Sequence, residues 1–364
     1  MLKTFLTTLL LATLLHLAPP AYATLQTDIT AACTTGGSVT VPTTVTITST
    51  LYMTCPPSAD NRPVRLVGSP SLITCSTGGT PCIVVGSTNT SARLNLMMKD
   101  VALVGPGRAA SGSEGIRILA TADESVFDNL RIDGFDLGLH LYAPSTDLLY
   151  TVFLTTIRIG MSVPYPSVNT AIHLNGFMGN IKLTGFHLAA WQRLLLFDGP
   201  AGNGSDVSMI QGSFNTTKTP GTPAVEVSTN DGGRRYVLIS HIEDWETSVP
   251  FVEIGVGSDV TLDNILVTGD PNQTPQYPAI HMAPNAFSTL TIANSFIAAQ
   301  SNGANLMQFG TAGGMIRISN SRLGGTINFF SPTSAILTGN WCQYPLTGTL
   351  TNVRASGNIG CPDQ

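Results

Sequence analysis

A short strand-like triplet repeats along the chain and constrains the fold more than any other feature. In each triplet an outward-facing residue stands between two apolar ones, and this period of two is typical of a strand with one buried face. The triplets recur about every 26 residues. We call the series of their central residues the first ladder: Arg117, His140, His173, Leu196, Glu226, Glu253, His281, Gln308 and Asn328.

A second series of short strands alternates with the first ladder. Its clearest members each end at an asparagine, four residues after their first apolar position: Asn264, Asn294, Asn320 and Asn340. Earlier repeats place other residues at this turn, with the last slightly out of register: Thr156, Gly185, Gln211, Ser240 and Asn129. We expect the asparagines to stack, each side-chain amide bonding to the next.

Repeats of this length predict stacked units, none of which buries its apolar face alone. The period of two excludes helical repeats, and the spacing is too short for the four strands of a propeller blade. The sequence therefore predicts an all-β fold, a solenoid of about nine or ten three-strand coils. An antiparallel β-sandwich is the alternative, and the scarcity of Asn-Gly hairpin turns disfavours it.

The N-terminus has the three parts of a secretory signal peptide over residues 1–23. Lys3 precedes an apolar run that is too short to span a membrane comfortably, and an Ala-Tyr-Ala sequence ends at Ala23. We expect a secreted protein, extracellular or periplasmic, with no membrane association after cleavage. Residues 24–364 would then form a single β-helix domain.

Both ends of the solenoid need a cover, because an open coil exposes unpaired backbone groups. Leu25, Ile29 and Ala32 stand at helical spacing, which predicts a short cap over residues 25–33. Residues 341–361 are expected to fold over the last coil.

Six cysteines fall into three pairs of close neighbours. An even number in an exported chain indicates disulfides. Pairing between neighbours would staple the two ends of the body through Cys33 and Cys55, Cys75 and Cys82, and Cys342 and Cys361. A zinc site is disfavoured, because the chain has no Cys-x-x-Cys motif and no histidine close to these cysteines.

The chain resembles the right-handed parallel β-helix proteins of the pectate-lyase-like superfamily. The resemblance rests on the coil pattern, the asparagine turns and the segment Gly36-Gly37-Ser38-Val39-Thr40-Val41-Pro42, which is similar to an opening common in that group. It implies a right-handed parallel β-helix with a polysaccharide partner, as a monomer or a trimer. The catalytic motifs of pectate lyases and polygalacturonases are absent, so neither specific activity is implied.

The resemblance also implies that the first ladder faces the substrate. Glu226 and Glu253 occupy adjacent rungs, where like charges repel each other. The pair has three interpretations: a Ca²⁺ site that bridges to an acidic sugar, the acid/base and nucleophile of a glycoside hydrolase, or a solvated polar pair whose repulsion His281 eases. Calcium is the one cofactor that the sequence indicates.

A polysaccharide lyase is the other candidate enzyme. A lyase needs a base that removes the proton alpha to a carboxylate and a cation that holds the developing charge. His173 fits the base and Arg117 the cation, with His140 and Gln308 on the same face as substrate-binding residues.

The acidic segment 241–246 combines a tryptophan with three carboxylates. Trp245, Glu243 and Asp244 are predicted to contact a sugar, because aromatic rings cover sugar faces well. The alternative is a loop whose tryptophan packs on the coil. Arg234 and Arg235, in the preceding loop, are expected to neutralise this cluster or to meet an anionic glycan.

The charge composition excludes one class of partner. With 17 basic against 22 acidic residues the net charge is −5, so binding to nucleic acid through phosphate neutralisation is excluded. The sequence predicts a secreted protein that binds, and as a candidate lyase or glycoside hydrolase cleaves, an extracellular polysaccharide. The alternative is a non-catalytic surface or adhesive β-helix protein.

Overall fold

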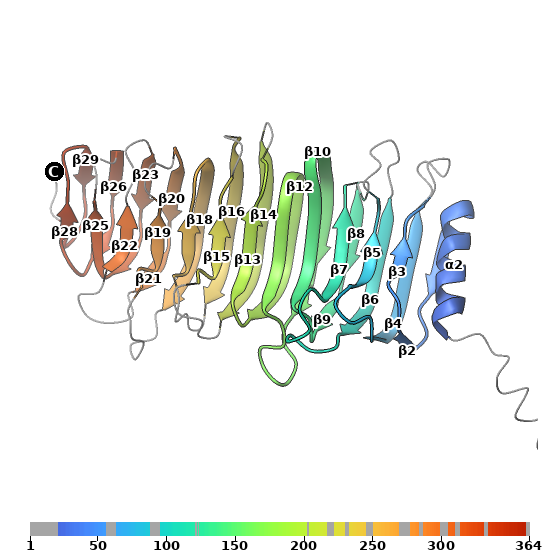
Figure 1. Ribbon diagram of the computed structural model, residues 1–364. Helices are drawn as coiled ribbons and strands as arrows, with labels where there is room; N and C mark the ends of the chain where they lie inside the picture. The colour runs from blue at the N-terminus through green and yellow to red at the C-terminus, as the bar shows by residue number, and fades with distance from the viewer. Residues whose placement is uncertain are drawn as a thin grey trace, which may run out of the picture.

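The computed structural model describes residues 21–55, 63–87, 95–120, 122, 124–201, 204–216, 222–229, 233–244, 250–268, 277–283, 287–298, 305–309, 314–330 and 334–361. The chain folds into a right-handed parallel β-helix (Figure 1). Each full coil contributes one strand to each of three sheets, which we call A, B and C in chain order. The strands pair in parallel from one coil to the next.

Sheet A contains the first ladder. Its separate strands are β3 (Leu51–Met53), β5 (Pro81–Val85), β7 (Glu114–Leu119), β13 (Arg193–Asp198), β15 (Val225–Val227), β17 (Val252–Ile254), β19 (Ile280–Met282), β22 (Asn305–Phe309), β25 (Thr326–Phe329) and β28 (Leu346–Gly348). The first parts of β10 (Leu137–Thr155) and β12 (Thr170–Ala190) also belong to it. Sheet A thus has twelve strands in the described residues, because β3, β5 and β28 extend the nine rungs found in the sequence.

Sheets B and C complete the coils. Separate strands of sheet B are β1 (Gly37–Thr40), β8 (Ser125–Asp128), β20 (Thr289–Ala293), β23 (Met315–Ser319), β26 (Ser334–Thr338) and β29 (Val353–Ser356). Those of sheet C are β2 (Thr44–Ile47), β9 (Arg131–Asp133), β11 (Arg158–Ile159), β21 (Phe296–Ala298), β24 (Arg322–Gly324) and β27 (Trp341–Cys342). Five long strands bend from sheet B into sheet C: β4 (Val64–Cys75), β6 (Leu96–Val104), β14 (Ser205–Thr216), β16 (Arg235–Asp244) and β18 (Ser258–Thr268). The second part of β10 belongs to sheet B, and β12 continues through sheets B and C.

The core fills the inside of the coils. Apolar side chains at alternate positions point inward, as in the buried–half-buried–buried pattern of β15, β17 and β19. Phenylalanines stack inside the middle coils: the ring centroids of Phe186 and Phe214 lie 5.5 Å apart, and those of Phe214 and Phe251 lie 6.1 Å apart. Polar side chains lie mainly at the outward positions, so the faces of the solenoid carry its chemistry.

The bend between sheets B and C depends on a residue in the left-handed conformation. The non-glycine residues at this position have φ between 49° and 59°: Asp100, Asn129, Thr156, Gln211, His241, Asn264, Asn294 and Asn320. Asparagine and glycine are the residues that adopt this conformation most readily. Glycine occupies the turn at Gly185 and Gly339.

Three details of the turn series differ from the sequence interpretation. Asn129 pairs in register, since the strand before it aligns with that before Thr156. His241, rather than Ser240, occupies the left-handed turn. Gly339 replaces Asn340 there, because Ala335 is the buried residue of its strand and the apolar Ile336 is 42% exposed.

The predicted stack of side-chain amides is found only at the C-terminal end of the described coils, where Asn340 Nδ2 donates to Asn358 Oδ1 at 3.0 Å. The Nδ2 atoms of Asn129 and Asn294 donate to carboxylates of the preceding coil, Asp100 Oδ1 at 2.7 Å and Asp263 Oδ1 at 3.0 Å. Asn340 instead lies buried inside the solenoid, where its Oδ1 accepts from the backbone N–H of Ser321 at 3.0 Å. Charged acceptors at the turn thus take the place of neighbouring amides.

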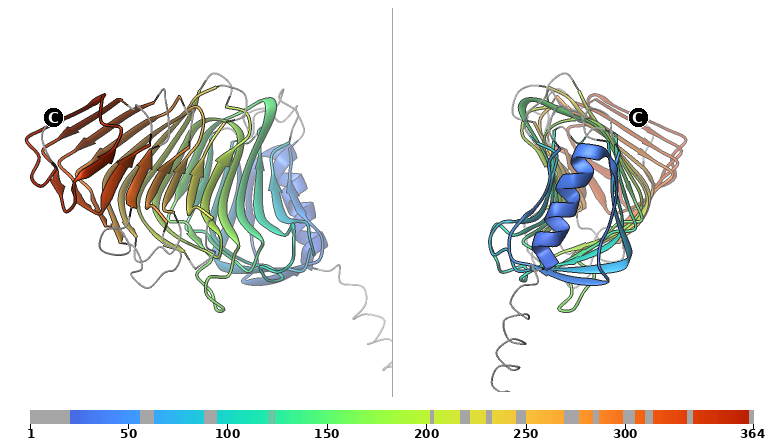
Figure 2. Two further views of the ribbon diagram at one scale, coloured as in Figure 1. Left: turned by 60° about the vertical axis from the view of Figure 1, so that its left-hand side comes forward. Right: turned by 90° about the vertical axis from the view of Figure 1, so that its right-hand side faces the viewer.

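Helix α2 (Ala21–Thr35) lies across the N-terminal end of the solenoid (Figure 2, right). Leu25, Ile29 and Ala32 are buried beneath it. The Gln26 amide donates to the carbonyl of Tyr52 and accepts from the N–H of that residue, both at 2.9 Å. The helix therefore pairs backbone groups that the first strand of sheet A would expose. It begins before Ala23, and residues 1–20 of the predicted signal peptide lie outside the described residues.

The C-terminal segment continues the solenoid instead of folding over it. Strands β27, β28 and β29 pair in register with β24, β25 and β26, so residues 341–361 form a further coil. Disulfides join Cys33 to Cys55, Cys75 to Cys82, and Cys342 to Cys361, as neighbour pairing predicts. Two bridges lie in the N-terminal coils and one in the last coil. No helix among the described residues is long and apolar enough to cross a membrane.

Candidate functional site

The outer face of sheet A presents the first ladder as one continuous row. Each central residue is directly paired with the next, from Arg117 and His140 through Glu226 and Glu253 to Gln308 and Asn328. The register therefore confirms that residues far apart in the sequence lie one above another. A hollow of about 440 Å³ covers part of this row and is lined by Glu226, Glu253, His281, Gln308, Tyr277 and three prolines.

At the N-terminal part of the row, Glu114 holds the side chains of Arg117 and His140. Arg117 donates from Nε and Nη2 to its two oxygens, at 2.8 and 2.5 Å, and His140 Nδ1 lies 3.2 Å from Oε1. Burial raises the pKa of Glu114, but the hydrogen bonds from His140 and Arg117 outweigh it and hold the pKa below its usual range. The cation that the lyase interpretation assigns is therefore paired with Glu114 through two of its five N–H donors.

The next rung brings a second histidine against the first. The rings of His140 and His173 stack with centroids 4.8 Å apart and planes at 3°. His173 Nε2 lies 2.9 Å from Asp198 Oδ1, which also accepts from Asn175 Nδ2 at 2.6 Å. Burial raises the pKa of Asp198, and the bonds from His173 and Asn175 with nearby positive charge bring it below its usual range. Each histidine of the stacked pair therefore has its own carboxylate.

The two glutamates on adjacent rungs each turn to a different cation. Glu226 accepts from Arg193 Nε at 3.0 Å, and Glu253 Oε2 lies 2.7 Å from His281 Nδ1. This pairing relieves the like-charge repulsion between Glu226 and Glu253. It agrees with the interpretation of a solvated polar pair, in which His281 has the expected role and Arg193 an unexpected one.

The predicted calcium site gains no further ligands in the structure. Among the described residues, no group of three or more histidines, cysteines, aspartates and glutamates is placed to hold a metal ion. Calcium usually takes six to eight oxygen ligands, whereas Glu226 and Glu253 already pair with Arg193 and His281. Calcium binding here stays a prediction.

The ion pair at the C-terminal part of the row predicts a pH-dependent stability. The hydrogen bond with Glu253 raises the pKa of His281 above 6.5, although burial opposes it. The stabilisation is therefore complete below the unfolded value and is lost as the pH rises through the folded value. Between about pH 5.5 and 8.5 we expect the protein to lose roughly 0.2–1 kcal/mol relative to His281→Gln. Thermal unfolding of both proteins across this range measures the difference, and a constant difference would contradict the assignment.

The acidic segment 241–246 belongs to another face. His241 occupies the turn between sheets B and C, and Glu243 points outward from sheet C. Trp245 and Glu246 lie outside the described residues, and the side chain of Asp244 is likewise not described. Glu243 is therefore not part of the sheet A row, and the sugar contact predicted for Trp245 and Asp244 stays a prediction.

Arg234 and Arg235 do not share the role expected of them. Arg234 is exposed and pairs with Asp259 Oδ2 at 2.9 Å. Arg235 is fully buried inside the solenoid, with its guanidinium 3.9 Å from the centre of the Phe197 ring. Because Arg235 occupies the inward side of β16, it is unable to reach either the acidic segment or a glycan.

Three residues that contact the stacked pair of His140 and His173, or its partners, are missing from the sequence interpretation: Glu114, Asn175 and Asp198. Asn175 and Asp198 each follow a ladder centre by two residues, which puts them on the same outward face by the period of two. Glu114 begins strand β7 and is reached by the side chain of Arg117. Extending each triplet by one further outward position would have found Asn175 and Asp198.

A groove larger than the hollow on sheet A lies along sheet C. It has a volume of about 1070 Å³ and is lined from His187 to Arg322, with Met161 and Tyr165 beside it. Met161 and Tyr165 belong to the loop that follows β11 (Arg158–Ile159). Two faces of the solenoid therefore carry candidate sites.

Comparison with solved structures places the chain among β-helix proteins of the pectate-lyase-like fold. The A-module of the mannuronan C-5 epimerase AlgE6 from Azotobacter vinelandii superposes with a TM-score of 0.66 at 14% identity, covering 95% of this chain and 97% of that one. The A-module of AlgE4 from the same organism gives 0.53 at 14% identity, covering 95% and 94%. No protein-family profile and no curated protein matches the sequence. At this identity the comparison shows the fold alone.

Proposed function

We propose that this chain binds an acidic extracellular polysaccharide along sheet A and removes the proton alpha to a sugar carboxylate. The observation that carries the proposal is the stacked pair of His140 and His173, in which each ring faces its own carboxylate. A histidine held by a carboxylate is a recurrent general base.

The hydrogen bonds assign the base to His173. A carboxylate only accepts, so the ring nitrogen that faces it carries the proton and the other nitrogen keeps a lone pair. For His173, whose Nε2 faces Asp198, the tautomer with the proton on Nε2 leaves Nδ1 to accept a substrate proton. The free nitrogen of His140, Nε2, is buried without a partner among the described residues. His173 is therefore the base, and His140 supports its ring.

Two arginines next to the pair provide positive charge for a sugar carboxylate. Arg117 uses Nε and Nη2 toward Glu114, and Arg193 uses Nε toward Glu226. Since a guanidinium has five N–H donors, further donors remain on each side of His173. Removal of the alpha proton leaves an enolate-like carboxylate, which these donors stabilise. The electron pair then either forms a double bond to the beta carbon and expels the glycosidic oxygen, which takes a proton from solvent, or accepts a solvent proton at the alpha carbon on the opposite face.

The compartment and the substrate class rest on separate support. Three disulfides and the predicted signal peptide favour action in an oxidising, extracellular space. The structural neighbours act on mannuronan at C-5, as their names state, which suggests a uronate polymer here too. Hydrolysis by Glu226 and Glu253 is disfavoured, because both carboxylates are already held in ion pairs, with Arg193 and His281.

The test is incubation of the purified protein with polymannuronate, polygalacturonate and a neutral glucan, with and without Ca²⁺. Elimination is followed by the ultraviolet absorbance of unsaturated uronate, and proton exchange by deuterium incorporation from D₂O in NMR spectra. We expect one of these signals with a polyuronate and neither with the glucan. New reducing ends with neither the absorbance nor the deuterium signal would mean hydrolysis. Binding without turnover would mean an adhesive protein. Each of these outcomes would overturn the proposal.

A further inference from the structure

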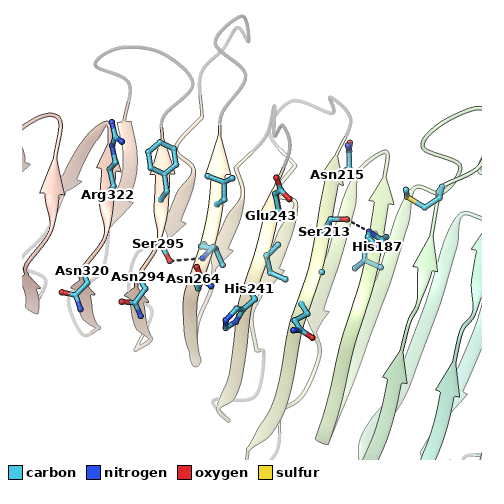
Figure 3. A pocket seen from close by; sticks show the side chains of 18 of the residues that line it. His187, Ser213, Asn215, His241, Glu243, Asn264, Asn294, Ser295, Asn320 and Arg322 are labelled. Carbon is cyan, nitrogen blue, oxygen red and sulfur yellow. Dashed lines mark hydrogen bonds between the residues drawn. The ribbon is translucent and has the colours of Figure 1, made fainter.

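The groove on sheet C is built from two parallel rows of side chains (Figure 3). The first row consists of residues at the left-handed turn, among them His241, Asn264, Asn294 and Asn320. The second consists of the first outward residue of each sheet C strand, and consecutive members pair in register. Neighbouring rungs of a parallel sheet lie about 4.8 Å apart, so the same kinds of group recur at regular intervals along the groove.

The turn row supplies amides in a repeating array. Asn264, Asn294 and Asn320 line the groove on three consecutive coils, with Gln211 two coils before them. An amide offers donors and an acceptor together, which suits the vicinal hydroxyl groups of sugars. A row that repeats with every rung fits a ligand that itself repeats.

The sheet C row supplies an aromatic surface and a fixed guanidinium. Arg322 lies 5.2 Å from the centre of the Phe296 ring and 4.7 Å from that of Trp341, so the guanidinium is held between two rings. Aromatic faces cover the apolar faces of sugars, and a guanidinium binds carboxylates through two parallel hydrogen bonds. Met161 and Tyr165, which are 40% and 43% exposed, flank the other end.

Cationic side chains lie toward both ends of the groove. A smaller hollow, lined by Arg131, Arg158, Met161 and His187, shares the last two residues with the groove and extends it. Among the described residues neither Arg158 nor Arg322 has an acidic partner, whereas Arg131 of the hollow is paired with Asp133, and Arg117 and Arg193 on sheet A are each paired with a glutamate. Glu243 is the one carboxylate among the lining residues described. Arg158 and Arg322, which have no acidic partner among the described residues, thus share the groove and its extension with a single lining carboxylate, in a chain whose net charge is −5.

We propose that this groove binds a linear acidic polysaccharide, with uronate carboxylates on Arg158 and Arg322 and sugar hydroxyl groups on the turn amides. The site lies on a different face from the histidine pair, so it goes beyond the proposed function and does not depend on catalysis. A peptide strand is a poor fit, because the backbone groups of sheet C are already paired within the sheet and leave no edge for strand addition. The groove would hold a polymer while sheet A acts on it.

The test compares Arg158→Ala/Arg322→Ala with the wild type in binding polymannuronate, measured by calorimetry. We expect at least about tenfold weaker binding from the loss of the two charged contacts. The matched control is Arg65→Ala/Arg354→Ala, which removes the same charge from two exposed arginines on sheet B and should change the affinity less than about twofold. Wild-type binding should also weaken between about 0.05 and 0.5 M salt, because ions screen exposed charges.

Three outcomes would overturn the inference. Equal binding by the groove variant and the control would mean that Arg158 and Arg322 do not contact the polymer. Equal binding of a neutral glucan would remove the preference for an acidic polymer. Self-association of the wild type, lost in the groove variant, would make the groove an interface between copies of this chain. If polymannuronate binds through these arginines while no turnover occurs, the proposed function fails and this site stands.

Discussion

Replacing His173 with alanine is expected to lower proton exchange or elimination on a polyuronate by roughly 10²- to 10⁴-fold, the usual contribution of a general base. The reason is positional, because Nδ1 of His173 is the accessible ring nitrogen of the stacked pair. Asp198→Asn should lower the rate as well, since an amide does not impose the same tautomer on the ring. The measurement is the initial rate with saturating polymer at several pH values.

Two controls separate catalysis from folding. Lys182 lies on the same strand, β12, but points outward from sheet B, so Lys182→Ala should leave the rate unchanged. Binding of polymannuronate should survive in His173→Ala, because the sheet C groove is intact. A rate reduced less than about threefold in His173→Ala would remove this residue from the reaction.

The alternation of apolar residues made most of the fold predictable. A period of two fixes which side of each strand is buried, and the repeat then fixes which residues lie one above another. The first ladder is accordingly confirmed rung by rung. The N-terminal cap was also visible, because three apolar residues at helical spacing have one natural place in a solenoid, across its open end.

The pattern assumes that apolar residues point inward and that the functional residues stand at the triplet centres. The prediction was wrong where either assumption did not hold. Ile336 is apolar but points outward, which shifted the last turn by one residue, from Gly339 to Asn340. The charge partners Glu114 and Asp198 lie beside the triplet centres instead of on them. Which charged side chains pair with each other depends on their rotamers, and sequence spacing does not determine rotamers.

The groove on sheet C was hidden for a different reason. Its outward row runs from His187 through Ser213 and Glu243 to Leu266, Phe296 and Arg322, a mixture without a chemical pattern along the sequence. Its depth depends on the bend at the left-handed turns and on the loop that carries Met161 and Tyr165. Both are properties of the folded coils, so only the structure reveals the hollow.

Arg235 was misplaced because arginine is ordinarily exposed. The signal was present nonetheless: Arg235 precedes Val237 and Ile239 by two and four residues, which makes it an inward position of the same strand. Its guanidinium donates to backbone carbonyls at the ends of sheet A strands. These are Ser228 at 2.6 Å, Gly176 at 3.2 Å, Asp198 at 2.7 Å and Gly199 at 2.5 Å.

Replacing Arg235 with methionine is expected to destabilise the protein by at least about 3 kcal/mol. Methionine has a similar length, but it leaves these buried carbonyls without donors, and each such acceptor costs roughly 1–3 kcal/mol. Arg235→Lys should have an intermediate effect, because an ammonium group has three donors and lacks the planar fork that reaches four carbonyls. Thermal and urea unfolding followed by circular dichroism measure the loss.

The neighbouring arginine provides the matched control. Arg234 is exposed and forms a surface ion pair with Asp259, so Arg234→Ala should cost less than about 1 kcal/mol. Because Arg235 fixes the carbonyl of Asp198, Arg235→Lys should also lower turnover at His173 while the protein is still folded. Equal stability of Arg235→Met and Arg234→Ala would mean that the carbonyls find water or other donors, and that the buried guanidinium does not hold the corner between sheets A and B together.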